Sequence, residues 1–318
     1  MTGTVESETE LVVLPKKGGR RPAAQQPRRP GLMKFGHWWW ALPGVILVIA
    51  IHYIATAIGG FFAFTDWSGI GDFAWIGLDN FVRIFQDPSK LLALGNTLFL
   101  ALGSVVLSNI VGLGLALALN RGLKSRYLLR VLFFMPVVLS PLAVSYIWKF
   151  IFDFNGPINL VLKAVGLGDL VKPWVADPSL AIWTVLIVIV WQNTGFAMVI
   201  YLAGLAAVPV EIEEAAAIDG ANLWQRFWHV VLPSIRPAVA IATTLGIVNG
   251  LRVFDQIMAL TSGGPAGATE TLATLVYKQS FALGNFGYGA ALALVLTLII
   301  LAFALVQQRV TAAPREEN

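Results

Sequence analysis

The sequence contains no cysteine and few histidine or charged side chains. It has 0 Cys and 3 His among 318 residues, and charged residues make up 13% of the chain. Without cysteine there is no disulfide, thiolate metal site or cysteine nucleophile. The histidines, at positions 37, 52 and 229, lack the spacing of paired metal ligands. These absences exclude thiol chemistry and argue against zinc.

Catalytic motifs are missing as well. No G-x-x-x-x-G-K-[ST] loop occurs anywhere in the sequence, so we expect no ATP phosphate site in this chain. A membrane-embedded enzyme would need a catalytic cluster such as H-E-x-x-H, and none is evident. We therefore expect a protein that is not an enzyme and has no catalytic residue, bound metal or cofactor of its own.

Apolar residues, in contrast, are abundant and arranged in long runs. They make up 57% of the chain, more than 13% charged residues can keep soluble. Runs near the roughly 20 residues that span a bilayer alternate with short polar stretches. This pattern predicts an all-α polytopic membrane protein with six transmembrane helices. We place them at 38–62, 93–119, 127–152, 180–207, 237–260 and 287–308.

The basic residues indicate the topology. Seven Lys/Arg lie within residues 1–36, among Pro, Gly and Gln, so we expect a disordered cytoplasmic tail there. A transmembrane domain over 37–309 and a second cytoplasmic tail over 310–318 follow. A cytoplasmic N-terminus puts 15 of the 22 Lys/Arg inside, which predicts a multi-pass membrane protein with both termini cytoplasmic. Because these charges flank apolar spans, the net charge of +4 indicates membrane lipid and no nucleic acid as partner.

The cytoplasmic loop at about 208–236 has unusually strong helix signals. It reads VPVEIEEAAAIDGANLWQRFWHVVLPSIR, with Pro209 suited to a first helical turn and glutamates suited to a helix N-terminus. Gly220 suits a left-handed stop, and Asn222 can cap a second helix. The loop therefore predicts a pair of helices joined by a turn.

The same loop resembles the EAA loop of ABC-importer permeases. The residues that carry this resemblance are Glu214, Ala215, Ala216, Asp219, Gly220, Leu232 and Pro233. Val230, usually Ile in that family, departs from the pattern. The resemblance implies a coupling helix that docks on a cytoplasmic ATPase. An amphipathic helix pair lying on the membrane surface is the alternative, but it does not require this order of acidic, Ala, Gly and Pro residues.

Four further segments are similar to the carbohydrate branch, the maltose/glycerol-phosphate-type permeases. They are WIGLDNF at 75–81, NGPIN at 155–159, AGLAAVP at 203–209 and TSGGP at 261–265. The resemblance covers about 38–308 and implies the type I importer fold.

A function follows from this resemblance. It implies one half of the translocation pathway of an ATP-driven sugar importer in a bacterial-type plasma (inner) membrane. The implied partners are a second homologous permease, two ATPase subunits or domains that bind ATP and Mg, and an extracytoplasmic sugar-binding protein. An ion-gradient-driven secondary transporter is the alternative, and it would usually show an internal repeat and interrupted helices around an ion site.

Polar residues inside the predicted spans indicate where a solute could pass, because buried polar groups are costly in a membrane. They are Gln192 and Asn193 in the fourth span, and Asn249, Arg252, Asp255 and Gln256 in the fifth. On a continuous helix the positions 249, 252 and 256 would share one face. Two readings of Arg252 and Asp255 stay open: a role in the pathway, or a structural ion pair near the outer interface. Neutral amides suit a neutral, polyhydroxylated solute.

Overall fold

The computed structural model describes residues 38–120 and 123–311, so most of the two predicted tails lies outside the described residues. Within these residues the regular elements are helices, apart from one isolated β-bridge between Thr65 and Trp75. The predicted all-α fold is therefore confirmed. The chain divides into two compact units, 1–53 and 54–318.

The first unit contains the start of the first predicted span. It holds the short η1 helix (Trp38–Ala41), α1 (Leu42–Val48) and most of η2 (Ile49–Ile54). Proline in the first turn of α1 fits the helix start, where its missing N–H is not needed. The helical stretch Trp39–Phe62, which ends with α2 (Ala55–Phe62), is long and apolar enough to cross a membrane and agrees with the predicted span at 38–62.

Three long helices in the second unit confirm the second, fourth and sixth predicted spans: α4 (Pro88–Leu119), α8 (Pro178–Ala206) and α15 (Phe286–Thr311). The starts of α4 and α8 share an Asp-Pro-Ser sequence, in which the Asp carboxylate accepts a hydrogen bond from the Ser N–H at 2.8 Å. Hydrogen bonds from Ser89 lower the pKa of Asp87 to about 2, so this cap is ionised at neutral pH.

The third predicted span is broken. In place of one helix over 127–152, the chain forms α5 (Arg126–Val138) and α6 (Pro141–Ile151), bent by 100°. The cause is local, because Pro141 has no N–H and favours an extended conformation at Ser140, where ψ is 142°. Ser140 then caps α6 by accepting a hydrogen bond from the Ala143 N–H at 3.2 Å. The span predicted at 127–152 is therefore a bent pair of helices and not one continuous helix.

The fifth predicted span, 237–260, is interrupted too. α12 (Arg236–Leu251) and α13 (Asp255–Leu260) are separated by residues that are not helical. Asn249 and Gly250 are weak helix formers in the last turn of α12, and the Asp255 carboxylate favours a new helix N-terminus. The predicted continuous helix through this segment is therefore wrong.

A second bent pair precedes the break in the fifth span. The helical stretch Leu223–Ser234 meets α12 at an angle of 68°. Counting each bent pair as one span, the described residues contain up to six candidate spans, the number that the sequence predicts. Leu223–Ser234 itself lies in the loop predicted at 208–236.

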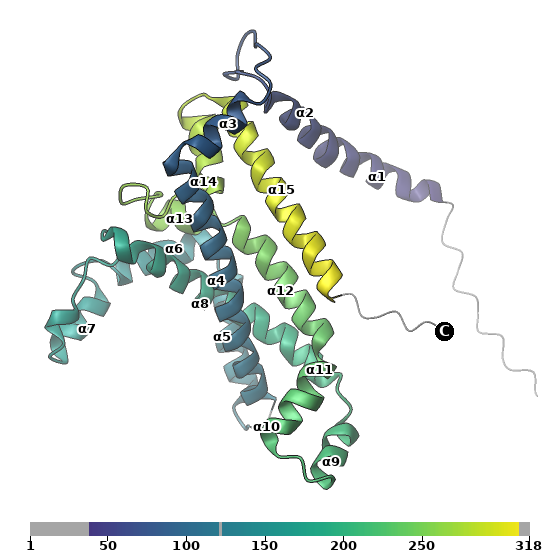
Figure 1. Ribbon diagram of the computed structural model, residues 1–318. Coiled ribbons are helices and arrows are strands. Elements are labelled where there is room, and N and C mark those ends of the chain that lie inside the picture. Colours follow the sequence, from purple (N-terminus) through teal and green to yellow (C-terminus); the bar gives the residue numbers. More distant parts are fainter. Residues whose placement is uncertain (1–37, 121–122, 312–318) are drawn as a thin grey trace, which may run out of the picture. The chain divides into compact units, whose positions relative to one another are not determined.

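Glycines allow α4, α5 and α8 to pack closely in the second unit, where they run side by side (Figure 1). A Cβ atom on Gly112 of α4 would lie 2.7 Å from the Ala197 Cβ of α8. A Cβ atom on Gly195 of α8 would lie 2.2 Å from the Phe133 carbonyl oxygen of α5. Small residues at such crossings are how membrane helices bring their backbones together.

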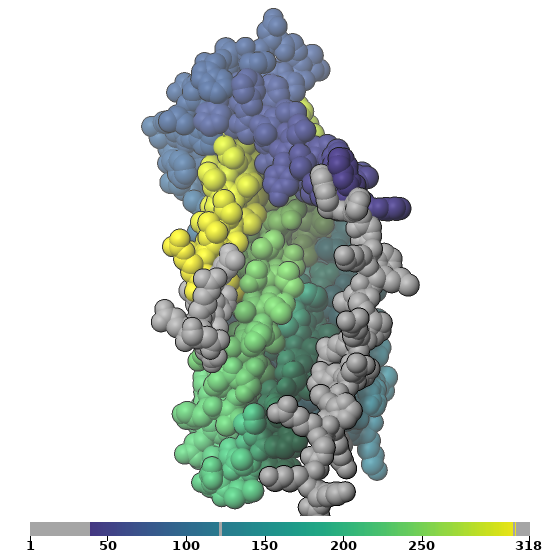
Figure 2. All heavy atoms as spheres, turned by 90° about the vertical axis from the view of Figure 1, so that its right-hand side faces the viewer, coloured from purple at the N-terminus to yellow at the C-terminus, as the bar shows by residue number. Residues whose placement is uncertain are grey.

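The second unit has two polar ends. One carries α9 (Val210–Ile218), α10 (Leu223–Arg226), η4 (Phe227–Val231) and α11 (Leu232–Ser234). The other carries α3 (Asp79–Gln86), α14 (Leu272–Tyr277) and η5 (Lys278–Ala282). Figure 1 shows α9 and α10 at the opposite end from α3, and Figure 2 shows α12, in green, extending from one end toward the other.

Candidate translocation cavity and coupling segment

A cavity of about 400 Å³ lies between α5, α6, α8 and the break after α12. All six side chains that the sequence predicts for a pathway line it: Gln192, Asn193, Asn249, Arg252, Asp255 and Gln256. The remaining wall comes from Val137, Leu139 and Pro141 at the bend between α5 and α6, and from Val253 and Phe254. Sequence reasoning missed the bend residues because an apolar run does not reveal where a helix breaks.

The polar residues reach this cavity by a different geometry from the predicted one. Asn249, Arg252 and Gln256 do not share a face of one helix, because α12 ends at Leu251. The chain instead turns between α12 and α13, which brings Arg252 and Asp255 to the same cavity as Asn193 of α8. The prediction that these three residues share one helix face is wrong, although all three line the same cavity.

Two glutamines of this set form hydrogen bonds between helices. The Gln192 amide donates to the Leu139 carbonyl at 3.0 Å, at the bend between α5 and α6. The Gln256 amide donates to the Gln192 side-chain oxygen at 3.2 Å. Both side chains are buried, with 5% and 8% of their surface exposed. They therefore satisfy a carbonyl that the broken helix leaves without a partner, at one wall of the cavity.

This contact gives the first prediction. Gln192→Ala removes both hydrogen bonds, and interhelical hydrogen bonds in membranes contribute about 0.6 kcal/mol on average and up to about 1.7 kcal/mol. We expect the free energy of unfolding to fall by about 1–3 kcal/mol, measured by denaturant unfolding in detergent. Asn193→Ala is the matched control, because the half-buried Asn193 makes no side-chain hydrogen bond to the described residues. Equal losses for the two variants would contradict the assigned contact.

The other four polar side chains of the cavity make no hydrogen bond or ion pair to the described residues. Asn249, Arg252 and Asp255 are exposed, and Asn193 is half-buried. No ion pair among the described residues joins Arg252 to Asp255, so the structural ion pair considered from the sequence is absent. A guanidinium, a carboxylate and two amides supply both donors and acceptors, as recognition of hydroxyl groups requires.

The candidate coupling segment, the loop at 208–236, forms the helix pair that the sequence predicts. α9 ends before Gly220, which has a φ of 84°, and the Ala221 N–H closes the turn on the Ala216 carbonyl at 3.0 Å. Asn222 and Gln225 then form a reciprocal capping box at the start of α10. These local rules explain why a sharp turn separates the two helices.

An ion pair joins the two helices of this segment. Arg226 of α10 lies 3.4 Å from Glu213 of α9, with about a third of the carboxylate side chain exposed. Leu232 and Pro233, which the EAA resemblance singles out, lie in α11, where the chain turns into α12. The exposed residues of that set are Glu214, Ala215, Asp219 and Gly220, while Ala216, Leu232 and Pro233 are half-buried.

The surface of this helix pair is apolar as well as polar. Ile218 is 86% exposed and Trp224 is 70% exposed. A groove of about 410 Å³ lies beside them, lined by Ala216, Asp219, Gly220, Ala221, Gln225, His229 and Val230. Exposed apolar side chains next to a groove are typical of a surface that binds another protein.

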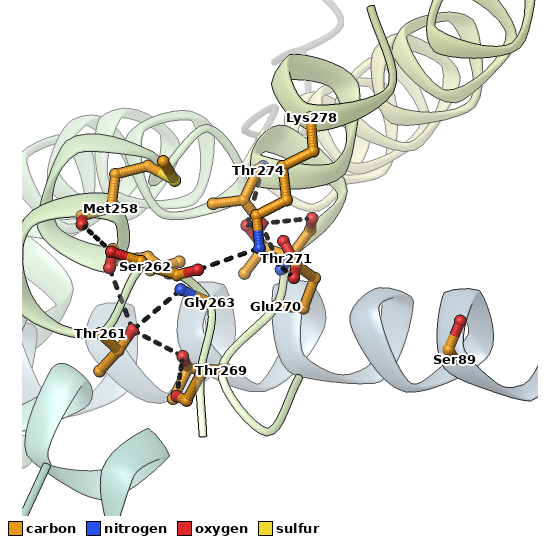
Figure 3. Close-up of polar contacts among 12 residues, drawn as sticks. Ser89, Met258, Thr261, Ser262, Gly263, Thr269, Glu270, Thr271, Thr274 and Lys278 are labelled. Carbon is orange, nitrogen blue, oxygen red and sulfur yellow. Dashed lines mark hydrogen bonds and ion pairs between the residues drawn. The ribbon is translucent and has the colours of Figure 1, made fainter. Parts of the chain in front are cut away.

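At the opposite end, polar contacts hold the loop at 261–271 (Figure 3). Lys278 Nζ lies 2.7 Å from Glu270 Oε2 and donates to the Ser262 carbonyl at 3.0 Å. Asn96 of α4 donates to the Glu270 carbonyl at 2.9 Å. The loop that contains TSGGP is therefore fixed to α4 and η5, and it directly follows α13, whose first residues line the cavity. Among the described residues, no cluster of three His, Asp or Glu side chains could hold a metal ion.

Comparison with known proteins identifies the family. The family described as "Binding-protein-dependent transport system inner membrane component" matches residues 108–315. The multiple sugar-binding transport system permease protein MsmF of Streptococcus mutans is 36% identical over 273 residues, which cover 86% of this chain and 93% of that protein. The trehalose/maltose transport system permease protein MalF of Thermococcus litoralis is 31% identical and covers 84% of this chain and 90% of its own length.

The fold is shared with a solved structure as well. A bacterial ABC transporter involved in the import of the acidic polysaccharide alginate matches with a TM-score of 0.76 and 23% identity, over 88% of this chain and 96% of that chain. At this identity the match shows the fold, the type I importer transmembrane domain, and leaves the solute of this chain open. The length of the family match and the two sequence relatives agree with the resemblance carried by the loop at 208–236, and the chain belongs to the family of inner membrane components of binding-protein-dependent transport systems.

Proposed function

We propose that this chain is one of two permease subunits of an ATP-driven sugar importer of a bacterial-type inner membrane. The observation that carries the proposal is the exposed α9–α10 pair, placed at the opposite end of the second unit from α3. Membership of the family supports it, as do relatives named as transporters of multiple sugars and of trehalose and maltose.

The residues that carry the proposed function lie in two regions, the α9–α10 pair and the cavity. Glu214, Ala215, Asp219 and Gly220 present the surface that contacts a cytoplasmic ATPase, which binds ATP and Mg. The small side chains permit close approach of a partner helix or cleft. This end of the second unit is then cytoplasmic, as are both termini, and the end that carries α3 is extracytoplasmic.

The cavity forms this chain's half of the translocation pathway. Its single Arg and single Asp balance in charge, and its amides provide paired donors and acceptors. These features support a neutral sugar as the solute. A second permease supplies the other half, and an extracytoplasmic binding protein delivers the sugar.

The proposal is tested by reconstituting this chain in proteoliposomes with the ATPase, the second permease and the binding protein that co-purify with it from its native membrane. We expect ATP hydrolysis and sugar uptake that both depend on the binding protein and its sugar. Uptake by the chain alone, driven by an ion gradient and without ATP, would favour the secondary transporter instead. No uptake and no ATP turnover with any of these partners would also overturn the proposal.

A further inference from the structure

A polar pocket at the α3 end of the second unit has no part in the function proposed so far. Its volume is about 350 Å³, and it lies where α3 meets the first residues of α4 and α15. Six side chains line it: Arg83, Gln86, Asp87, Lys90, Gln279 and Tyr288.

The two cations of this pocket differ in their partners. Lys90 Nζ lies 3.2 Å from an Asp87 carboxylate oxygen and donates to the Ser89 hydroxyl at 2.9 Å. Asp87 therefore neutralises Lys90. No carboxylate of the described residues lies within 4.0 Å of the Arg83 guanidinium. The pocket keeps one net positive charge, and that charge is on Arg83.

Arg83 is also held in a defined orientation. Its guanidinium carbon lies 4.8 Å from the centre of the Tyr288 ring, and the side chain is exposed. Its N–H groups donate no hydrogen bond to the described residues. A stacked guanidinium with free donors is suited to bidentate binding of a carboxylate, because little side-chain freedom remains to be lost.

We propose that this pocket receives one acidic side chain of the extracytoplasmic binding protein, with Arg83 as its direct contact. This inference rests on the proposed function, which places the pocket on the extracytoplasmic side of the membrane. A single carboxylate matches the single unpaired cation, and the Gln86 and Gln279 amides can donate to the same group. The Asp87 carboxylate disfavours a phosphate group, whose charge is spread over more oxygens, and so disfavours a lipid headgroup.

The test is Arg83→Ala in the reconstituted complex. We expect the concentration of binding protein that gives half-maximal ATP hydrolysis to rise at least about tenfold, since a charge-assisted contact of this kind contributes about 1.5–3 kcal/mol. The dependence of that concentration on salt should weaken, while ATP hydrolysis at saturating binding protein stays unchanged. The half-maximal concentration of binding protein for Arg83→Lys should lie between the values for the wild type and for Arg83→Ala. Lysine keeps the charge but loses the bidentate geometry.

Lys163→Ala is the matched control. Lys163 is an exposed cation that lies 5.6 Å from the centre of the Phe154 ring, in α7 (Pro157–Ala164) and away from the pocket. Its removal should leave the half-maximal concentration unchanged. If the binding protein stimulates the complex but Arg83→Ala and Lys163→Ala have the same half-maximal concentration of binding protein, this inference is wrong. The proposed function is then unaffected.

Three other results of the same experiment would count against the inference or the proposed function. If no binding protein stimulates the wild-type complex, the proposed function itself fails. If Arg83→Ala loses the second permease during purification, Arg83 is a contact between subunits and the inference is wrong. If the effect of Arg83→Ala occurs only in vesicles that contain anionic lipid, the pocket binds a lipid headgroup, and the inference is wrong in that case as well.

Discussion

Gly195→Ala is expected to prevent the chain from folding in the membrane. The added Cβ atom would lie 2.2 Å from the Phe133 carbonyl oxygen and 3.0 Å from the Phe134 Cα, and both are backbone atoms of α5. Neither can rotate away, so α5 and α8 would have to separate along their length. Overpacking of a core costs about 1–3 kcal/mol even where side chains can adjust, so we expect a loss of more than about 3 kcal/mol. The measurement is the yield of monodisperse protein in detergent, together with its unfolding temperature.

Gly114→Ala provides the control within α4. A Cβ atom on Gly114 would meet no other atom within 4 Å, so alanine adds helix propensity without a clash. This variant should be as stable as the wild type, or more stable by up to about 1 kcal/mol. A normal yield of Gly195→Ala would show that α5 and α8 do not approach as closely as the structure indicates.

Gly220→Val is expected to uncouple ATP hydrolysis from transport. Gly220 has a φ of 84°, a conformation that costs a β-branched residue roughly 1–3 kcal/mol. The turn between α9 and α10 must then change, which moves the exposed face of α9 relative to α10. We expect sugar uptake in proteoliposomes to fall at least about tenfold, since contacts of a partner with both helices depend on this turn. Basal ATP hydrolysis and co-purification of the partners are measured on the same preparations.

Gly166→Val imposes the same strain elsewhere. Gly166 has a φ of 80° and, like Gly220, has open space around the position of a Cβ atom. It follows α7, outside both the cavity and the coupling segment. Uptake should remain near the wild-type level in this variant. An equal loss for both valine variants would mean that general destabilisation, and not coupling, explains the result at Gly220.

Sequence reasoning succeeded where a local rule determines the structure. The left-handed residue at Gly220 and the cap at Asn222 depend only on their neighbours, and both are present. The long helices α4 and α8 were predictable because their apolar runs are long enough to span a membrane. The family resemblance depended on several sequence segments that occur in a particular order along the chain.

The breaks in the third and fifth spans were not predictable in this way. Pro141 is visible in the sequence, but a proline can begin a helix, kink it or divide it, and the surrounding packing decides which occurs. Gln192 illustrates the same limit. A polar residue in an apolar span must find a partner, but the sequence does not say whether that partner is a solute or the Leu139 carbonyl.

The bend between α5 and α6 also affects the order in which the chain can become stable during synthesis. At a rise of about 1.5 Å per residue, α5 with 13 residues and α6 with 11 residues are each shorter than the roughly 30 Å apolar layer of a bilayer. The Leu139 carbonyl at the bend obtains its hydrogen bond from Gln192, which the ribosome adds 53 residues later. The third span therefore cannot complete its hydrogen bonds as it enters the membrane, and its insertion is expected to finish only after α8 has followed it. A nascent chain that stops before α8 should be recognised by membrane quality control, whereas one that includes α8 should not.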